Sequence, residues 1–207
     1  IAYQAFDFIN QSLRQGFDNA IKLEAQLKRI YSISRGQDQS GIRKSSLDSI
    51  KLGLGVEDVS NSAYQAISSQ FTSAEASRLM EVSAKSAVAG FTTQTDAMDA
   101  LTTIIRAYNL SVEDATRVSD VLFKTIELGK TELKDLAPDI GKISATASLL
   151  GISFEEVSAG LATMTLNGIK TNVAITSMNQ LLLNMTKPTA EAKAILDKYG
   201  ISLDIAE

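Results

Sequence analysis

The sequence predicts an all-α protein, in which an elongated N-terminal helix is followed by an array of short helices packed as a compact bundle. Apolar residues recur at steps of three and four residues, which is the spacing of one helix face. The segments between these stretches carry glycine or asparagine and then serine, threonine or an acid, as where one helix ends and the next begins. No stretch alternates apolar and polar residues for long enough to predict a strand. We therefore expect helix over more than about two-thirds of the chain and no sheet.

The first predicted helix covers residues 1–35 and is amphipathic. Its apolar residues form one continuous stripe, made of Phe6, Ile9, Leu13, Phe17, Ala20, Leu23, Leu27 and Ile30. A stripe of this length must be covered, either by the rest of the chain or by a second copy of the same helix. The two arrangements look alike in a sequence, and we favour the second copy.

A polar hinge at residues 36–41 precedes the shorter helices. These are expected at residues 42–52, 56–70, 73–88, 95–108, 111–128, 131–150, 153–166, 171–186 and 189–199. Candidate N-caps are Ser73, Thr95, Ser111, Thr131, Ser153, Thr171 and Thr189, and candidate terminating glycines are Gly90, Gly129, Gly151, Gly168 and Gly200. Inward faces are expected at Met98, Leu101, Ile105 and Tyr108, at Phe154, Val157, Leu161 and Met164, and at Ala174, Met178, Leu181 and Met185.

A seven-residue phrase recurs in this array. Its copies are Gly53–Val59, Asn109–Ala115 and Gly151–Val157, with a degraded fourth copy at Gly200–Ile205. Each copy begins with the Gly or Asn that ends a helix in a left-handed turn. Serine or glycine then stands at the next N-cap, followed by acids in the first turn. The pairs Ser111–Asp114 and Ser153–Glu156 have the spacing of a capping box. The copies are unevenly spaced, so they indicate shared capping chemistry and not a repeat protein.

Three regions are expected from this pattern. Residues 1–35 form the long helix, residues 36–91 form a loosely packed helical connector, and residues 92–207 form a compact helical core domain. The last region has the densest series of helix and turn signals.

The composition excludes several kinds of chemistry. The chain has no His, Cys or Trp, which removes the usual general base, the thiol nucleophile and the imidazole metal ligand. Three acid pairs, at residues 57–58, 113–114 and 155–156, could suggest a carboxylate dyad or a cation site. Each lies in the first turn of a predicted helix, where acids favour the positive helix end. We therefore predict no catalytic residue, no cofactor site and no metal site.

Two weaker signals are also better explained by structure. Leu128-Gly129-Lys130-Thr131 resembles the end of a phosphate-binding loop, but the required earlier glycine is replaced by Lys124 and a helix precedes it. Residues 1–52 carry 8 Lys and Arg against 5 Asp and Glu, a small excess typical of a solvated helix face. No apolar run approaches the roughly 20 residues that span a bilayer.

Residues 92–204 resemble the core region of phage tail tape measure proteins. The resemblance is carried by four blocks in family order and spacing, Val118–Gly141, Ala147–Ala162, Asn167–Thr171 and Leu181–Pro188. It implies a structural protein of the virion, without enzymatic activity, that lies in the lumen of the phage tail after synthesis in the host cytoplasm. Tail tube subunits polymerise around such a protein, so that its length sets the tail length, and it leaves ahead of the DNA on infection.

The resemblance also implies partners. These are other copies of the chain, the tail tube protein, the tail tip or baseplate hub and assembly chaperones, with transient contact to DNA or host membrane and no small-molecule substrate. Two other readings stay open from the residues alone: a bacterial helical-bundle signalling or scaffolding protein, and a membrane-permeabilising helical protein. Glycines at 129, 141, 151 and 168 count against the long unbroken helix pair of the first.

Overall fold

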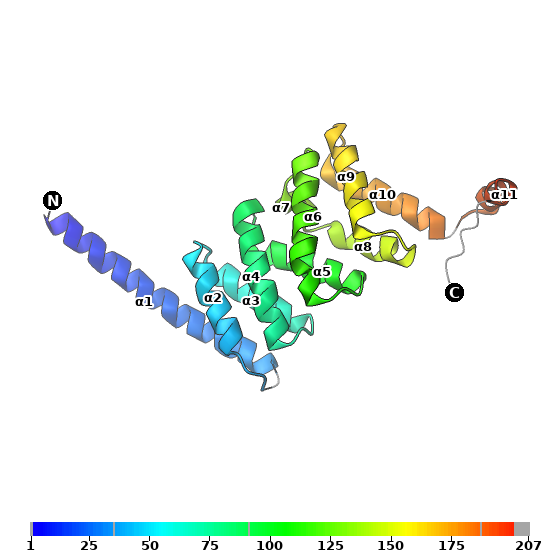
Figure 1. Ribbon diagram of the computed structural model, residues 1–207. Coiled ribbons are helices and arrows are strands. Elements are labelled where there is room, and N and C mark those ends of the chain that lie inside the picture. The colour runs from blue at the N-terminus through cyan, green and yellow to red at the C-terminus, as the bar shows by residue number, and fades with distance from the viewer. Residues whose placement is uncertain (1, 35, 91, 187, 201–207) are drawn as a thin grey trace. The chain divides into compact units, whose positions relative to one another are not determined.

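The protein is all-α, as predicted. The computed structural model describes residues 2–34, 36–90, 92–186 and 188–200 (Figure 1). Helices make up 79% of the chain, and no strand occurs among the described residues. The chain divides into two compact units. Unit 1 contains residues 1–88 and 93–98, and unit 2 contains residues 89–92 and 99–207.

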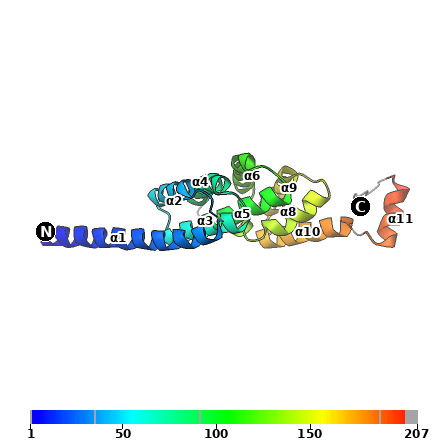
Figure 2. The same cartoon turned by 90° about the horizontal axis from the view of Figure 1, so that it is seen from below.

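Unit 1 is built on one long helix. Its elements are α1 (Ala2–Ile33), α2 (Ser40–Lys51), α3 (Val56–Ser68), most of α4 (Ser73–Gly90) and the start of α5 (Gln94–Ala107). α3 packs on the C-terminal half of α1, where Leu23, Leu27 and Ile30 are buried. In Figures 1 and 2 the N-terminal half of α1 extends beyond α2, α3 and α4. Of the described members of the predicted stripe, the chain therefore buries only Leu23, Leu27 and Ile30; the side chains of Phe6 and Ile9 lie outside the described residues.

The interior of unit 1 is unusually rich in serine and holds a buried amide. Gln94 is fully buried, and its Nε2 donates to Ser49 Oγ at 3.2 Å, to Met80 O at 3.1 Å and to Ser83 Oγ at 3.3 Å. Since these acceptors belong to α2 and α4, one side chain joins three helices. Its own Oε1 has no partner.

Unit 2 is a bundle of shorter helices. It contains α5 from Asp99 on, the 3-10 turn η1 (Val112–Asp114), α6 (Ala115–Leu128), α7 (Leu133–Leu136), α8 (Ile140–Leu149), α9 (Phe154–Leu166), α10 (Thr171–Thr186) and α11 (Ala190–Lys198). α6 packs on α9, and α10 packs on α7, α8 and α9. α6 and α9 run in the same direction, because Arg117 meets Glu155 near their starts and Gly129 meets Thr165 near their ends.

The prediction of a single helix over residues 131–150 is wrong. Two helices, α7 and α8, occupy this range and are separated at Ala137-Pro138-Asp139. Proline has no backbone N–H, so it cannot donate the next helical hydrogen bond and the helix stops there, although Ala137 itself keeps helical geometry with φ −52° and ψ −46°. Ala137 N still donates to Leu133 O at 2.8 Å and closes α7.

Several predicted N-caps are displaced by one or two residues. Thr72, not Ser73, caps α4: Thr72 N donates to Glu75 Oε2 at 2.7 Å, and Glu75 N donates to Thr72 Oγ1 at 3.3 Å. Ser73 is buried and its hydroxyl has no partner.

Thr131 is likewise not the N-cap of α7, which is Glu132. Instead, the Thr131 hydroxyl lies 2.7 Å from that of Thr171, the first residue of α10. Thr189 directly precedes α11, as expected.

The recurring phrase behaves as predicted. Gly53, Asn109, Gly151 and Gly200 all have positive φ, at 93°, 49°, 71° and 70°. Capping boxes are present at Ser111 with Asp114 and at Ser153 with Glu156. Residues 201–205 of the fourth copy lie outside the described residues.

One predicted inward face needs correction. Leu181 is 58% exposed, whereas its neighbour Leu182 is 4% exposed and faces the core. The other predicted members, Ala174, Met178 and Met185, are buried or half-buried. Three consecutive leucines at residues 181–183 offer no polar neighbour from which the inward one could be chosen.

Candidate interaction surfaces

The three acid pairs are occupied in holding helix starts. Asp58 caps α5 from another helix: its carboxylate accepts from Gln94 N at 2.7 Å, Thr95 N at 2.9 Å and Thr95 Oγ1 at 2.7 Å. Thr95 was predicted as the N-cap of this helix. Instead, its own N–H and hydroxyl are bound by the Asp58 carboxylate. The sequence gives no signal for this contact, because its two sides are 36 and 37 residues apart.

The other two pairs close their capping boxes. The Asp114 carboxylate accepts from Ser111 N at 3.1 Å, and that of Glu156 accepts from Ser153 N at 2.8 Å. Arg117 forms ion pairs with both Asp114 and Glu155, and so links the starts of α6 and α9. Groups of three or more acids that could hold a metal ion are absent from the described residues.

The ionisation of these groups agrees with a capping role. Hydrogen bonds from the serine side chain and backbone lower the pKa of Asp114 and of Glu156. Burial raises the pKa of Tyr108 to about 12; its ring lies 6.0 Å from that of Phe154, and its hydroxyl has no partner. A lowered carboxyl pKa keeps both acids charged, so neither is suited to donate a proton as a general acid.

The segment that resembled a phosphate-binding loop is packed into the bundle. A Cβ on Gly129 would lie 2.5 Å from Thr165 Oγ1, 2.8 Å from Thr125 O and 3.0 Å from Ala162 Cα. Its φ of −96° is open to any residue, so glycine is needed here for the close approach of α6 to α9 and not for a left-handed turn. The expectation of a structural role for this segment is supported by these contacts.

The first exposed apolar surface lies on α1. All residues from Asn10 to Lys22 are exposed, including Leu13 at 57% and Phe17 at 71%. We call Leu13, Gly16, Phe17 and Ala20 the bare seam. They continue the stripe that α3 buries at Leu23, Leu27 and Ile30, so the same face of one helix is covered at one end and open at the other.

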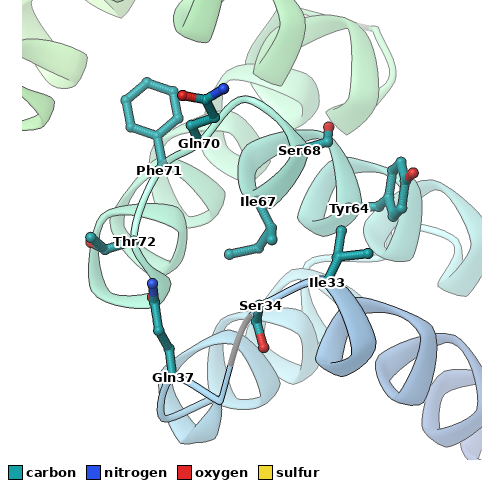
Figure 3. Close-up of a pocket in the computed structure, with 9 residues that line it drawn as sticks. All are labelled: Ile33, Ser34, Gln37, Tyr64, Ile67, Ser68, Gln70, Phe71 and Thr72. Atoms are coloured by element: carbon teal, nitrogen blue, oxygen red, sulfur yellow. The ribbon is translucent and has the colours of Figure 1, made fainter.

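A hollow of about 570 Å³ lies in unit 1 where α1 and α3 end and the turn into α4 begins (Figure 3). It is lined by Ile33, Ser34, Gln37, Tyr64, Ile67, Ser68, Gln70, Phe71 and Thr72. In Figure 3, Ile67 projects into the opening, and Gln37 reaches across toward Thr72. Gln37 Oε1 accepts from Ser73 N at 2.7 Å, so its amide is already used to hold the start of α4. None of these lining residues is an acid or a base.

A third surface lies at one end of unit 2. Leu128 and Leu166 are the last residues of α6 and α9, which end side by side, and Ile169 follows in the next turn. All three are exposed, Leu166 at 65%. Large contiguous apolar patches are typical of surfaces that meet another protein. None of the three surfaces was predicted as a whole, because the exposure of a side chain depends on which helices pack beside it.

Among the described residues, no helix is both long and apolar enough to cross a membrane.

Comparisons with known proteins agree with one another. The family described as phage-related minor tail protein matches residues 43–207. A probable tape measure protein of Clostridium phage phiCD119 is 33% identical over 149 residues, which cover 70% of this chain and 16% of that protein. A tape measure protein of Pneumococcus phage Dp-1 is 28% identical over 104 residues, covering 50% of this chain and 9% of that protein. The chain therefore corresponds to a small part of the length of each relative. No solved structure matches it.

Proposed function

The chain belongs to the phage-related minor tail proteins, and from this premise we propose that it is a segment of a tail tape measure protein, which templates tail tube length during assembly and leaves ahead of the DNA on infection. The observation that carries the proposal is the family match over residues 43–207, together with tape measure relatives from two phages. A structural role in the tail follows from the family itself. The partners we propose are other copies of the chain, the tail tube protein, the tail tip or hub and assembly chaperones. The place of action is the tail lumen.

We propose that the segment acts without catalysis. The acid pairs are held in helix starts by the hydrogen bonds described above, and none of the described residues that line the hollow of unit 1 is charged. What the segment offers is surface: a bare seam on α1 and an apolar end on unit 2.

Within this role, we propose that residues 92–204 anchor and do not measure. As one continuous helix, the 207 residues would span roughly 310 Å. In the folded chain, the helices after α1 are 4 to 18 residues long, and α6 to α10 of unit 2 pack on one another. A folded element contributes little length per residue, which suits a docking or initiation element. The part that measures length would then be uninterrupted helix in other parts of the protein. The 32-residue helix α1 is an example of such a helix.

An in-frame deletion of residues 92–204 in the phage tests this division. If the element is an anchor, the deletion abolishes tail assembly or infectivity. A pure ruler instead gives functional tails shortened by about 1.5 Å per deleted residue, or about 170 Å. Electron micrographs distinguish the two, and intact tails shortened by that amount would refute the anchor.

A matched pair of variants separates folding from length. Leu136→Ala with Leu161→Ala removes two fully buried side chains of unit 2 and leaves the number of residues unchanged. The anchor proposal expects tails to be lost, because the folded element is destabilised by several kcal/mol. Leu149→Ala with Leu181→Ala, at exposed positions of α8 and α10 outside the apolar end, should leave tails intact. Normal tails from the first pair would contradict the proposal.

A further inference from the structure

We propose that the hollow of unit 1 is a binding site for a short neutral saccharide. The proposal goes beyond the tail role and does not depend on it, because it concerns one unit of the isolated chain. The site binds the saccharide and does not cleave it. None of the described lining residues is an acid, so this lining does not offer the pair of carboxylates that a glycosidase uses.

The first argument is the backbone of Gln70, which lines the hollow in a left-handed conformation with φ 65°. Gln70 N donates to Ile67 O at 3.0 Å, and Phe71 N donates to Ala66 O at 3.4 Å, so that this pair of bonds closes the end of α3. The same pair of bonds closes other helices of the chain, at Gly53, Asn109, Gly151 and Gly168.

Glutamine is the unusual member of this set of helix ends. Glycine adopts the left-handed conformation without strain and asparagine visits it readily, whereas a glutamine is strained by its Cβ. Backbone strain of this kind is found at binding sites, where the side chain is needed in spite of its cost. We therefore take Gln70 as a residue that is present for its amide.

The second argument is that two amides at the hollow are free to bind a ligand. Gln70 is exposed, and its side chain has no hydrogen-bond partner in the part of the chain that the structure describes. Gln37 uses Oε1 to accept from Ser73 N at 2.7 Å, and leaves the two hydrogens of Nε2 without an acceptor among the described residues. An amide both donates and accepts, so these side chains suit a ligand that carries hydroxyl groups.

The serines of the hollow favour the same kind of ligand. Ser34 Oγ donates to Tyr31 O at 3.0 Å, and Ser68 Oγ donates to Gln65 O at 3.0 Å. Since their hydrogens are used, these oxygens can only accept, and a ligand must bring donors to them. An ionised carboxylate brings acceptors alone, and no base among the described lining residues would compensate its charge. The ligand is therefore neutral and rich in hydroxyl groups.

The third argument is an aromatic ring that is open to solvent. Tyr64 is 46% exposed, and in Figure 3 it lies with Ile33 across the opening from Gln37 and Thr72. Such a ring suits a ligand that is apolar on one face and polar at its edge. A saccharide ring has this character, because its C–H groups form an apolar face and its hydroxyls surround it. The volume of about 570 Å³ lies within the range of about 300–1,000 Å³ for small-molecule sites.

The test is a titration of the 207-residue chain, followed by the NMR signals of its side-chain amides. The probes are two neutral saccharides, maltotriose and tri-N-acetylchitotriose. We expect at least one of them to shift the amide signals of Gln37 and Gln70, with a Kd of about 1 mM or tighter. Two controls of similar size are trigalacturonic acid, which is anionic, and acetyl-triglycine amide, which is a neutral peptide. Both should bind at least about tenfold more weakly, since one is charged and the other lacks hydroxyl groups.

Two results of this titration would overturn the proposal. One is the absence of binding by both saccharides, and the other is a peptide that binds as tightly as the better saccharide. Neither result bears on the tail role, which is tested by the deletion phage.

A matched pair of glycine substitutions separates backbone strain from binding. Gln70→Gly removes the strain together with the amide, so the melting temperature should rise by about 2–4 °C. Its affinity for the saccharide should fall about tenfold. Asn109→Gly is the same change at the equivalent helix end of unit 2, and should raise the melting temperature less and leave the affinity unchanged.

A substitution at the aromatic ring gives a second readout. Tyr64→Ala removes a half-exposed side chain, and should weaken saccharide binding about tenfold while the melting temperature changes little. Unchanged affinity in either Gln70→Gly or Tyr64→Ala would contradict the site. A lower melting temperature for Gln70→Gly would show that this glutamine serves the fold, and would also overturn the proposal.

Discussion

Unit 1 and unit 2 are built from similar helices but bury different side chains. Among the described residues, unit 1 buries eight serines and ten apolar side chains larger than alanine, whereas unit 2 buries three serines and fifteen such apolar side chains. Burial of apolar area supplies most of the stabilisation of a core, and a buried hydroxyl adds little when bonded and costs free energy when unbonded. The comparison indicates that unit 1 holds together more weakly. Its amides should therefore exchange hydrogen at a lower opening free energy than those of unit 2.

The substitution with the largest expected effect should make unit 2 open more easily than unit 1. Leu161 is fully buried in α9, and Leu161→Ala should destabilise unit 2 by about 3 kcal/mol, through lost transfer free energy and the cavity left behind. Native-state hydrogen exchange should then show unit 2 opening before unit 1. The control is Leu166→Ala, at an exposed position of the same helix, which should change stability by less than about 0.5 kcal/mol. Equal effects from the two substitutions would show that α9 is not part of the core.

Glycine substitutions should also separate the two units. In unit 2, Gly129→Ala brings a methyl group against the backbone of α9, which should cost about 1–3 kcal/mol. In unit 1, the methyl group of Gly41→Ala meets chiefly the Ser77 hydroxyl, which can rotate away, and alanine favours the helix. This variant should be neutral or more stable. Thermal melts followed by circular dichroism compare them, and a larger loss from Gly41→Ala would mean that unit 1 is the tighter of the two.

A smaller effect concerns helix starts in unit 2. Ser153→Ala should cost about 1 kcal/mol, since it removes the acceptor of Glu156 N and half of the capping box. Glu155→Gln weakens a half-exposed ion pair with Arg117 and a helix-end interaction, and should cost a few tenths of a kcal/mol. Urea titrations rank the two. The opposite ranking would mean that charge and not capping holds α9 in place.

The smallest expected effect is a gain in unit 1. Ser62 is fully buried and its hydroxyl has no partner, so Ser62→Ala should stabilise unit 1 by up to about 1 kcal/mol. Ser46→Ala is the matched change at a hydroxyl that donates to Ile42 O at 2.8 Å, and should bring no gain. Hydrogen exchange in unit 1 measures both. A loss from Ser62→Ala would show that its hydroxyl has a partner in solution, such as a bound water.

The local part of this fold could be predicted from the sequence, and the part that depends on distant neighbours could not. Helix-stop residues such as Asn109 and Gly151 and the capping box at Ser153 act within a few residues, so their signals were sufficient. The break at Pro138 was also visible in the sequence, and was missed because the apolar pattern continues through it. The capping of α5 by Asp58 depends on a packing contact that no local pattern reveals.

The candidate surfaces show the same limit. The stripe on α1 was predicted as one helix face, but the apolar pattern does not show which part of that face the chain itself will cover. The covered part depends on the length of α3, which has 13 residues and is therefore too short to cover the 32 residues of α1. The choice of Leu182 over Leu181 as the buried residue depends likewise on the rotation of α10 against its neighbours.

The serine hydroxyls of unit 1 have a mechanical consequence. Ser46, Ser49, Ser60 and Ser86 each donate to the carbonyl four residues earlier in their own helix. These polar groups keep their partners when a helix is pulled away from its neighbours. Among the described residues, separation breaks chiefly the hydrogen bonds of Gln94 and Asp58, that of Ser45 to Ser77 O and that of Ser73 N to Gln37. Under an applied force, we expect the helices of unit 1 to resist separation mainly at these few cross-links and not along the serine-lined faces between them.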